Sequence, residues 1–210
     1  MMVTQAELLS VRKWARVSVA GIGLFLAIVV LLHVVRPEYD VITRFVSEYA
    51  VSDPLAAAVA GISLGIGAMA LARALTAALP QGQRPRAGIV LLWVFGVCAV
   101  GFGVFPADEF PTVNPPSWHG IIHAVLAVIG FFSFSVGTLL VSFRLRRVPA
   151  RRKDAPLLIG IAALCLLGFF LLYAGLPIVG LVERLYVLVI LSWMGLLAKG
   201  LLRDTASFTP

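Results

Sequence analysis

Two histidines four residues apart, His119 and His123, are the residues of this sequence best suited to chemistry. On a helix this spacing places both side chains on one face. There, two imidazoles can hydrogen-bond structurally, carry protons or bind a headgroup, or ligate a metal ion. A divalent metal such as zinc would take His119, His123 and Asp108 as ligands, with Glu183 or His33 as further candidates. All three interpretations remain open at this stage.

Glu183 and Arg184 are adjacent ionisable residues within a strongly apolar stretch. Ionisable groups inside a membrane are costly, and they are functional candidates by default. Neighbours on a helix point about 100° apart, so each is expected to meet a partner on another segment. We expect Arg184 to pair with Asp108 or Glu48, in either a structural or a catalytic role.

The segment 37–53 has an amphipathic pattern at helical spacing. Its apolar positions are Tyr39, Val41, Ile42, Phe45, Val46 and Tyr49, and its polar positions are Asp40, Thr43, Arg44, Ser47 and Glu48. This pattern predicts a short helix in the membrane interface. It is either an inert cover over the protein or a lid that points Arg44, Ser47 and Glu48 into a polar pocket.

The composition determines what positions these residues. Sixty per cent of the 210 residues are hydrophobic and only 13% are charged, whereas a soluble domain has about 25% charged residues. A membrane-spanning helix needs about 20 mostly apolar residues. The sequence therefore predicts a single all-α integral membrane domain over 1–210, a six-transmembrane-helix bundle. The predicted spans are residues 15–35, 54–78, 87–105, 118–142, 156–175 and 178–201.

The distribution of charge predicts the orientation. Fourteen of the 17 Lys and Arg residues fall in the terminal segments and around the loops after the second and fourth spans. Cytoplasmic loops carry this excess, so we expect a protein of the cell membrane with both termini in the cytoplasm. The positive charge then contacts anionic lipid, and nucleic acid is not an expected partner.

Four motifs lie at the opposite ends of the spans: Phe45–Ala50, Gly103–Asp108, Trp118–His123 and Gly180–Arg184. With these motifs the chain resembles the prokaryotic integral membrane family labelled domain of unknown function 998, over nearly its whole length. The resemblance implies six spans and marks Ser47, Glu48, Pro106, Asp108, His123, Glu183 and Arg184, but it implies no activity. A fainter likeness extends to the eukaryotic Frag/DRAM/Sfk membrane proteins.

These residues are expected to form one polar pocket on the extracytoplasmic side, with membrane lipids as partners. The pocket would bind or handle a lipid or phosphate headgroup, with Arg44, His119 and Arg184 as binding residues. The alternative is a membrane-embedded lipid hydrolase or transferase, metal-dependent or not. Its catalytic candidates are Ser47, Glu48, Asp108, His123 and Glu183. A small-solute transporter is a second alternative, although the cytoplasmic halves of the spans hold no comparable polar groups.

Overall fold

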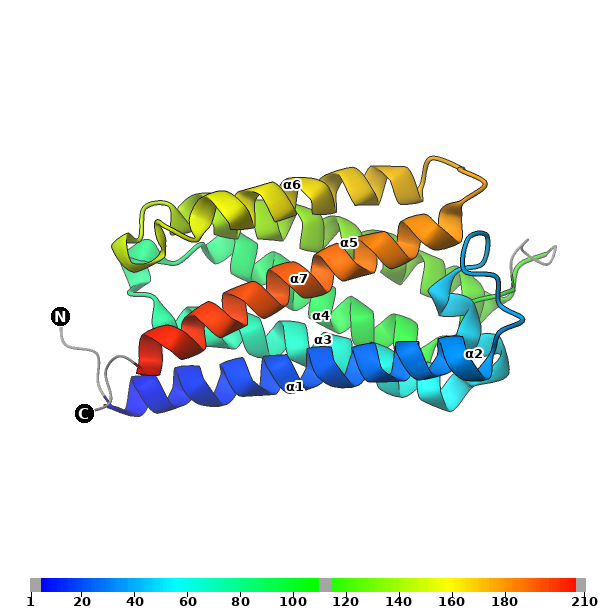
Figure 1. The fold of residues 1–210 in the computed structure, drawn as a ribbon, viewed down its shortest axis with the longest axis horizontal. Helices are drawn as coiled ribbons and strands as arrows, with labels where there is room; N and C mark the ends of the chain where they lie inside the picture. The colour runs from blue at the N-terminus through cyan, green and yellow to red at the C-terminus, as the bar shows by residue number, and fades with distance from the viewer. Residues whose placement is uncertain (1–4, 110–114, 207–210) are drawn as a thin grey trace.

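A computed structural model describes residues 5–109 and 115–206, and in this part of the chain the regular secondary structure is all helical, without strands (Figure 1). Its six long helices are long and apolar enough to cross a membrane, which confirms the predicted bundle. They are α1 (Gln5–Val35), α3 (Pro54–Ala78), α4 (Arg86–Val104), α5 (Trp118–Leu145), α6 (Ala155–Leu172) and α7 (Val179–Ala206). The short helices are η1 (Val46–Glu48), α2 (Tyr49–Ser52), η2 (Gln81–Gln83) and η3 (Pro149–Arg151).

The helix α1 begins at Gln5, well before the predicted start near residue 15. Val11 and Ala15 are buried against the bundle, so the helix continues through the basic residues beside them. Tertiary packing extends the helix here beyond the apolar stretch that the membrane requires.

The segment between α1 and α3 is not one surface helix. It makes turns and then the short helices η1 and α2. Tyr39 and Tyr49 are buried, but Val41 and Ile42, which belong to the same predicted apolar face, are exposed. The amphipathic segment is therefore present, with only part of its apolar face turned inward.

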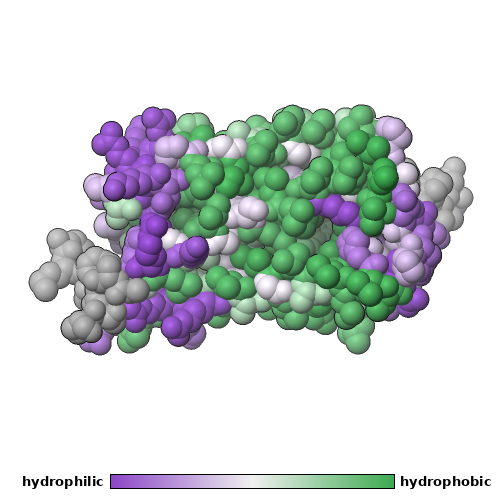
Figure 2. All heavy atoms as spheres, in the orientation of Figure 1, coloured by the Kyte–Doolittle hydropathy of each residue, from purple (hydrophilic) through white to green (hydrophobic). Residues whose placement is uncertain are grey.

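The long helices pack in sequence order around a ring, and α7 closes the ring against α1. The start of α1 and the end of α7 lie at one end of the bundle, which we call the terminal end, and α2 lies at the other, which we call the α2 end (Figure 1). Hydrophilic residues gather at both ends, and a broad hydrophobic belt separates them (Figure 2).

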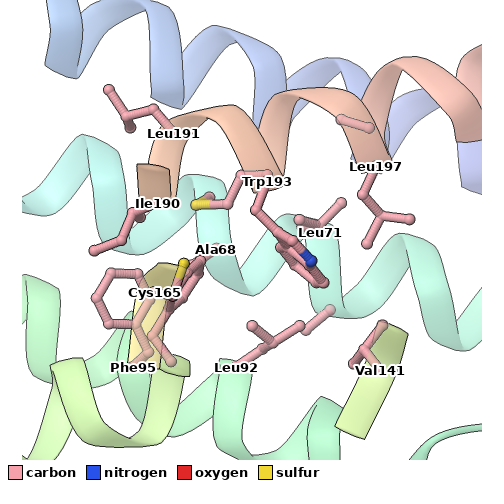
Figure 3. Packing of buried hydrophobic residues seen from close by; sticks show 14 of the residues in the cluster. Ala68, Leu71, Leu92, Phe95, Val141, Cys165, Ile190, Leu191, Trp193 and Leu197 are labelled. Atoms are coloured by element: carbon pink, nitrogen blue, oxygen red, sulfur yellow. The ribbon is translucent and has the colours of Figure 1, made fainter. Parts of the chain in front are cut away.

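Large side chains fill the centre of the bundle (Figure 3). Trp193 of α7 is fully buried, meets Phe134 of α5 at a centroid distance of 5.8 Å, and donates a hydrogen bond from Nε1 to Ser142 Oγ at 3.0 Å. Phe95 of α4 is also fully buried beside Phe134. This packed layer separates the polar groups of the α2 end from those of the terminal end.

Glycine lets α3 and α4 approach closely. A Cβ atom added at Gly65 would lie 2.5 Å from the carbonyl oxygen of Gly96. In lipid, close backbone approach of this kind supplies the van der Waals contact that holds helices together.

We expect Gly65→Val to force α3 and α4 apart and to destabilise the protein by about 1–3 kcal/mol. The matched control is Gly23→Val on α1, where an added Cβ meets nothing within 4 Å. Thermal unfolding in mild detergent compares the two variants. Equal unfolding temperatures for both would show that the α3–α4 contact is not close-packed.

Candidate functional site

A groove of about 420 Å³ lies at the α2 end, between α5, the end of α6 and the start of α7. We call it the lateral groove. Most of its wall is apolar, and Ile121, Val125 and Val128 on its rim are 50%, 51% and 41% exposed on α5. The acidic, imidazole and serine side chains that line it are Ser47, Glu48, Asp108, His123 and Glu183. All five residues that were predicted from the sequence as catalytic candidates therefore line the same groove.

A smaller cavity of about 70 Å³ lies deeper in the bundle, and we call it the inner cavity. Ser47, His123 and Glu183 line both spaces, together with two phenylalanines. These three side chains therefore stand between the bundle interior and the lateral groove. Within the described residues, no hydrogen bond joins any two of them.

His123 is oriented by the end of α4. The last carbonyls of a helix have no partner within the helix, and His123 Nδ1 lies 3.0 Å from the carbonyl oxygen of Phe102 and 2.8 Å from that of Phe105. Because carbonyl oxygens only accept, Nδ1 carries the proton. In neutral His123 this leaves Nε2 as the acceptor nitrogen on a ring that lines both spaces.

Glu183 joins α7 to the segment that precedes α3. It is 6% exposed, and its Oε2 accepts a hydrogen bond from the backbone N–H of Val46 at the start of η1. The N–H of Leu181 donates to the carbonyl oxygen of Ile42 at 3.0 Å, beside this contact. The segment is thus docked on α7, so η1 presents Ser47 to the groove.

Glu48, which is 1% exposed, is paired with Arg44. Arg44 Nε lies 3.0 Å from Glu48 Oε2, and its Nη2 lies 2.5 Å from Glu109 Oε1. Glu48 Oε1 also accepts a hydrogen bond from the backbone N–H of Phe45 at 2.7 Å. Arg44 is thus engaged by two carboxylates and does not line the lateral groove.

Arg184 faces α1 rather than the groove. Its Nε donates to His33 Nε2 at 2.7 Å, and its Nη1 donates to the carbonyl oxygens of Arg44 and Gly180 at 2.7 and 3.0 Å. The predicted pairing of Arg184 with Asp108 or Glu48 is therefore wrong. In the observed rotation of α7 about its axis, Glu183 faces η1 and Arg184 faces His33.

Asp108 fastens the loop after α4 to the start of α5. Its two carboxylate oxygens accept hydrogen bonds from Ser117 Oγ at 2.5 Å and from the Ser117 backbone N–H at 2.9 Å. The Ser117 Oγ in turn accepts from the N–H of Gly120 at 3.0 Å and so caps the helix. Hydrogen bonds from Ser117 to the charged form hold the pKa of Asp108 below its ordinary value.

His119 belongs to the same loop contact and does not line the lateral groove. Its Nδ1 lies 3.1 Å from the carbonyl oxygen of Pro106 and 2.9 Å from Ser117 Oγ. Over residues 5–109 and 115–206, no group of three or more His, Cys, Asp and Glu residues could hold a metal ion. The predicted ligands His119, His123 and Asp108 therefore do not form such a group.

We expect Ser117→Ala to cost about 1 kcal/mol of stability at neutral pH, the usual effect of losing an N-cap. Part of this loss is the hydrogen bonding of Ser117 to the charged Asp108, which lowers the pKa of Asp108. The stabilisation from this bonding is complete above the ordinary carboxyl pKa and is lost as the pH falls and Asp108 is protonated. The difference between wild type and variant should therefore shrink below about pH 4. Thermal unfolding at pH 7 and pH 3.5 measures it, and a difference that grows in acid would contradict this role.

Comparison with known protein families agrees with this layout. The family model described as "Protein of unknown function (DUF998)" matches residues 19–199. The chain belongs to this family. The matched region of this DUF998 protein includes all the groove residues described above. No curated protein and no solved structure matches the chain.

Two features of this DUF998 protein were missed from the sequence. The Tyr49 side chain, counted there only as apolar, lines the inner cavity and is 1% exposed. Its hydroxyl has no hydrogen-bond partner among the described residues, so Tyr49 adds a polar group to those of Ser47, His123 and Glu183 around that space. His33 was considered only as a metal ligand, but it holds Arg184. A polar atom at an otherwise apolar position was the available signal in both cases.

Proposed function

We propose that this DUF998 protein binds an amphiphile from the membrane. Its hydrocarbon part lies in the lateral groove, and an uncharged or cationic head that donates hydrogen bonds lies at Ser47, His123 and Glu183. One observation carries this proposal: a single groove of about 420 Å³ combines apolar walls with these polar residues. This is the usual composition of a small-molecule site, and the volume lies within its usual range of about 300–1,000 Å³.

The charged residues that line the lateral groove favour an uncharged or cationic head of the amphiphile over an anionic one. Glu48, Asp108 and Glu183 all line it, and no lysine or arginine does. Arg44 is held by Glu48 and Glu109, and Arg184 by His33 and backbone carbonyls. A phosphate head, which the sequence suggested, would meet carboxylates with no opposing cation in the lining. Hydroxyl or ammonium donors suit the acceptors of the groove better.

The rim supports entry from the membrane. Its half-exposed apolar residues on α5 would face lipid in a bilayer, so a chain can enter the groove without leaving hydrocarbon. The charge bias of the loops supports an orientation with the α2 end on the extracytoplasmic side of the cell membrane. The lipid would then come from the outer leaflet.

Blocking the groove tests the proposal. Monoolein, an uncharged single-chain lipid with free hydroxyl groups, is titrated into detergent-solubilised protein, and the bound molecules are counted by native mass spectrometry. Val128→Trp fills the groove, whereas Ile129→Trp changes the next residue of α5, which is similarly exposed but does not line the groove.

We expect Val128→Trp to weaken monoolein binding about tenfold, or about 1.4 kcal/mol, and Ile129→Trp to leave it within about twofold of wild type. Equal binding by both variants, or tighter binding of the anionic oleoyl lysophosphatidic acid than of monoolein, would overturn the proposal.

A lipid hydrolase or transferase is the second candidate, and the orientation of His123 favours it. A neutral imidazole whose Nδ1 is held by backbone carbonyls presents Nε2 as a base. Ser47, which lines the same two spaces, would be the nucleophile and pass its hydroxyl proton to that nitrogen. A fluorophosphonate probe tests this role: labelling of wild type that is lost in both Ser47→Ala and His123→Ala supports it, and absent labelling opposes it.

A further inference from the structure

A second groove lies at the terminal end, where α5 ends and α6 begins. Its volume is about 700 Å³. Its basic lining residues are Arg144, Arg146, Arg147 and Arg152, and its other lining residues are Leu140, Phe143 and Pro156. No acidic residue is among them. We call it the arginine groove, and it is unrelated to the lateral groove at the α2 end.

The exposed arginines of this groove are not engaged by acidic side chains. Among the described residues, no carboxylate forms an ion pair with Arg146, Arg147 or Arg152. The nearest acidic residue in the chain, Asp154, instead contacts Arg203 at 2.9 Å on the other side of the α6 start. The positive charge of the groove is therefore available to an external anion.

Arg144 gives the groove a fixed wall. Its Nε donates to the carbonyl oxygen of Gln83 at 3.2 Å, and its Nη2 donates to the carbonyl oxygen of Gly82. These bonds tie α5 to the loop that contains η2. They hold the guanidinium beside the exposed arginines without neutralising it.

The apolar part of the groove sets its depth in the membrane. Leu140 and Phe143 are 42% and 49% exposed on α5. Leu140 lies about one turn before Arg144, and Phe143 directly precedes it. The hydrophilic terminal end adjoins the hydrophobic belt of the molecule (Figure 2). Basic side chains beside exposed apolar ones at this boundary match the level where phospholipid phosphates meet their acyl chains.

We propose that the arginine groove binds an anionic phospholipid. The phosphate lies among Arg146, Arg147 and Arg152, and the first part of an acyl chain lies on Leu140 and Phe143. The planar guanidinium presents paired N–H donors that match phosphate oxygens. A free phosphate would use the same donors but would gain nothing from the apolar residues.

Lipid binding by native mass spectrometry tests this site. Dioleoyl phosphatidylglycerol is titrated into the full chain in mild detergent, with dioleoyl phosphatidylcholine as the zwitterionic comparison. The test variant is Arg146→Gln/Arg147→Gln/Arg152→Gln. The matched control, Lys13→Gln/Arg16→Gln/Lys199→Gln, removes equal charge from exposed positions at the same end. Soluble glycerol phosphate is added as a competitor without acyl chains.

We expect wild type to prefer phosphatidylglycerol, and the test variant to lose at least about tenfold in affinity, because it removes the three guanidinium groups that contact the phosphate. The control should change affinity by no more than about twofold. An equal loss of phosphatidylglycerol affinity in both variants would show that general surface charge, and not the arginine groove, causes the binding, and would overturn the proposal. Equal binding of both lipids, or displacement by glycerol phosphate at the concentration of the lipid itself, would overturn it as well.

Discussion

Replacing Glu183 with alanine should abolish measurable binding of monoolein, a loss of at least about 100-fold. The substitution removes the carboxylate from both the lateral groove and the inner cavity. It also leaves the backbone N–H of Val46 without its acceptor, so η1 loses the contact that holds Ser47 in place. Native mass spectrometry of the detergent-solubilised protein measures the binding.

Glu183→Gln separates the two consequences. The amide oxygen can still accept from Val46, so the segment should remain docked on α7, while the negative charge is lost. We expect this variant to unfold near the wild-type temperature and to bind monoolein within about fivefold of wild type. It should lose any preference for a cationic head. Wild-type binding by a folded Glu183→Ala protein would refute the place of Glu183 in the site.

Replacing Arg151 with leucine should destabilise the protein by about 2–4 kcal/mol. The Arg151 side chain is 5% exposed, and its Nη2 lies 2.9 Å from Asp204 Oδ2 on α7. A Cβ atom added at Gly200 would lie against the Arg151 guanidinium, so this group fills the space beside the α7 backbone. Leucine would remove the contact of Arg151 with Asp204 and leave a gap beside Gly200. Thermal or denaturant unfolding in detergent measures the change.

Two further variants distinguish the ion pair of the buried Arg151 from surface charge. Arg152→Leu removes the same charge at the adjacent, exposed position and should change stability by less than about 0.5 kcal/mol. Adding Asp204→Leu to Arg151→Leu should restore part of the loss, because the carboxylate that loses its contact with Arg151 is then removed as well. Equal losses for Arg151→Leu and Arg152→Leu would rule out a specific role for the pair.

The long helices were predictable because the membrane imposes one simple rule. In hydrocarbon, a continuous stretch of about 20 apolar residues forms a helix, because the helix supplies hydrogen-bond partners to its own backbone N–H and C=O groups. The observed limits of α3, α4 and α5 therefore agree with the predicted spans to within a few residues. The segment 37–53 is too polar to span a membrane, so this requirement does not determine its structure. Asp40 Oδ1 accepts hydrogen bonds from the N–H groups of Ile42 and Thr43 at 3.0 and 2.8 Å. This side-chain turn competes with the helix that the apolar spacing suggested.

The sequence was sufficient to predict which residues line the site, but not which side chains contact one another. Position along a span gives the depth of His123 and Glu183 in the membrane, and the segment that contains Ser47 joins two spans at the same end. The three residues were therefore placed together from the sequence. Pairing depends on how each helix is rotated about its axis, and only packing sets that rotation. Arg184 therefore meets His33 rather than a carboxylate. His119 and His123 share a helix face but lie about 6 Å apart along it, and they contact different backbone carbonyls.

Photo-crosslinking in membranes tests the central claim, that the polar residues of the α2 end and the apolar wall of α5 form one amphiphile site. A monoacylglycerol with a diazirine in its acyl chain is added to vesicles that contain the protein, and the labelled residues are mapped by mass spectrometry. We predict that labels concentrate on Val125, Val128 and Leu172 in the lateral groove. Labels spread evenly over exposed membrane-facing residues outside it, such as Leu31, Val97 and Leu167, would contradict the account.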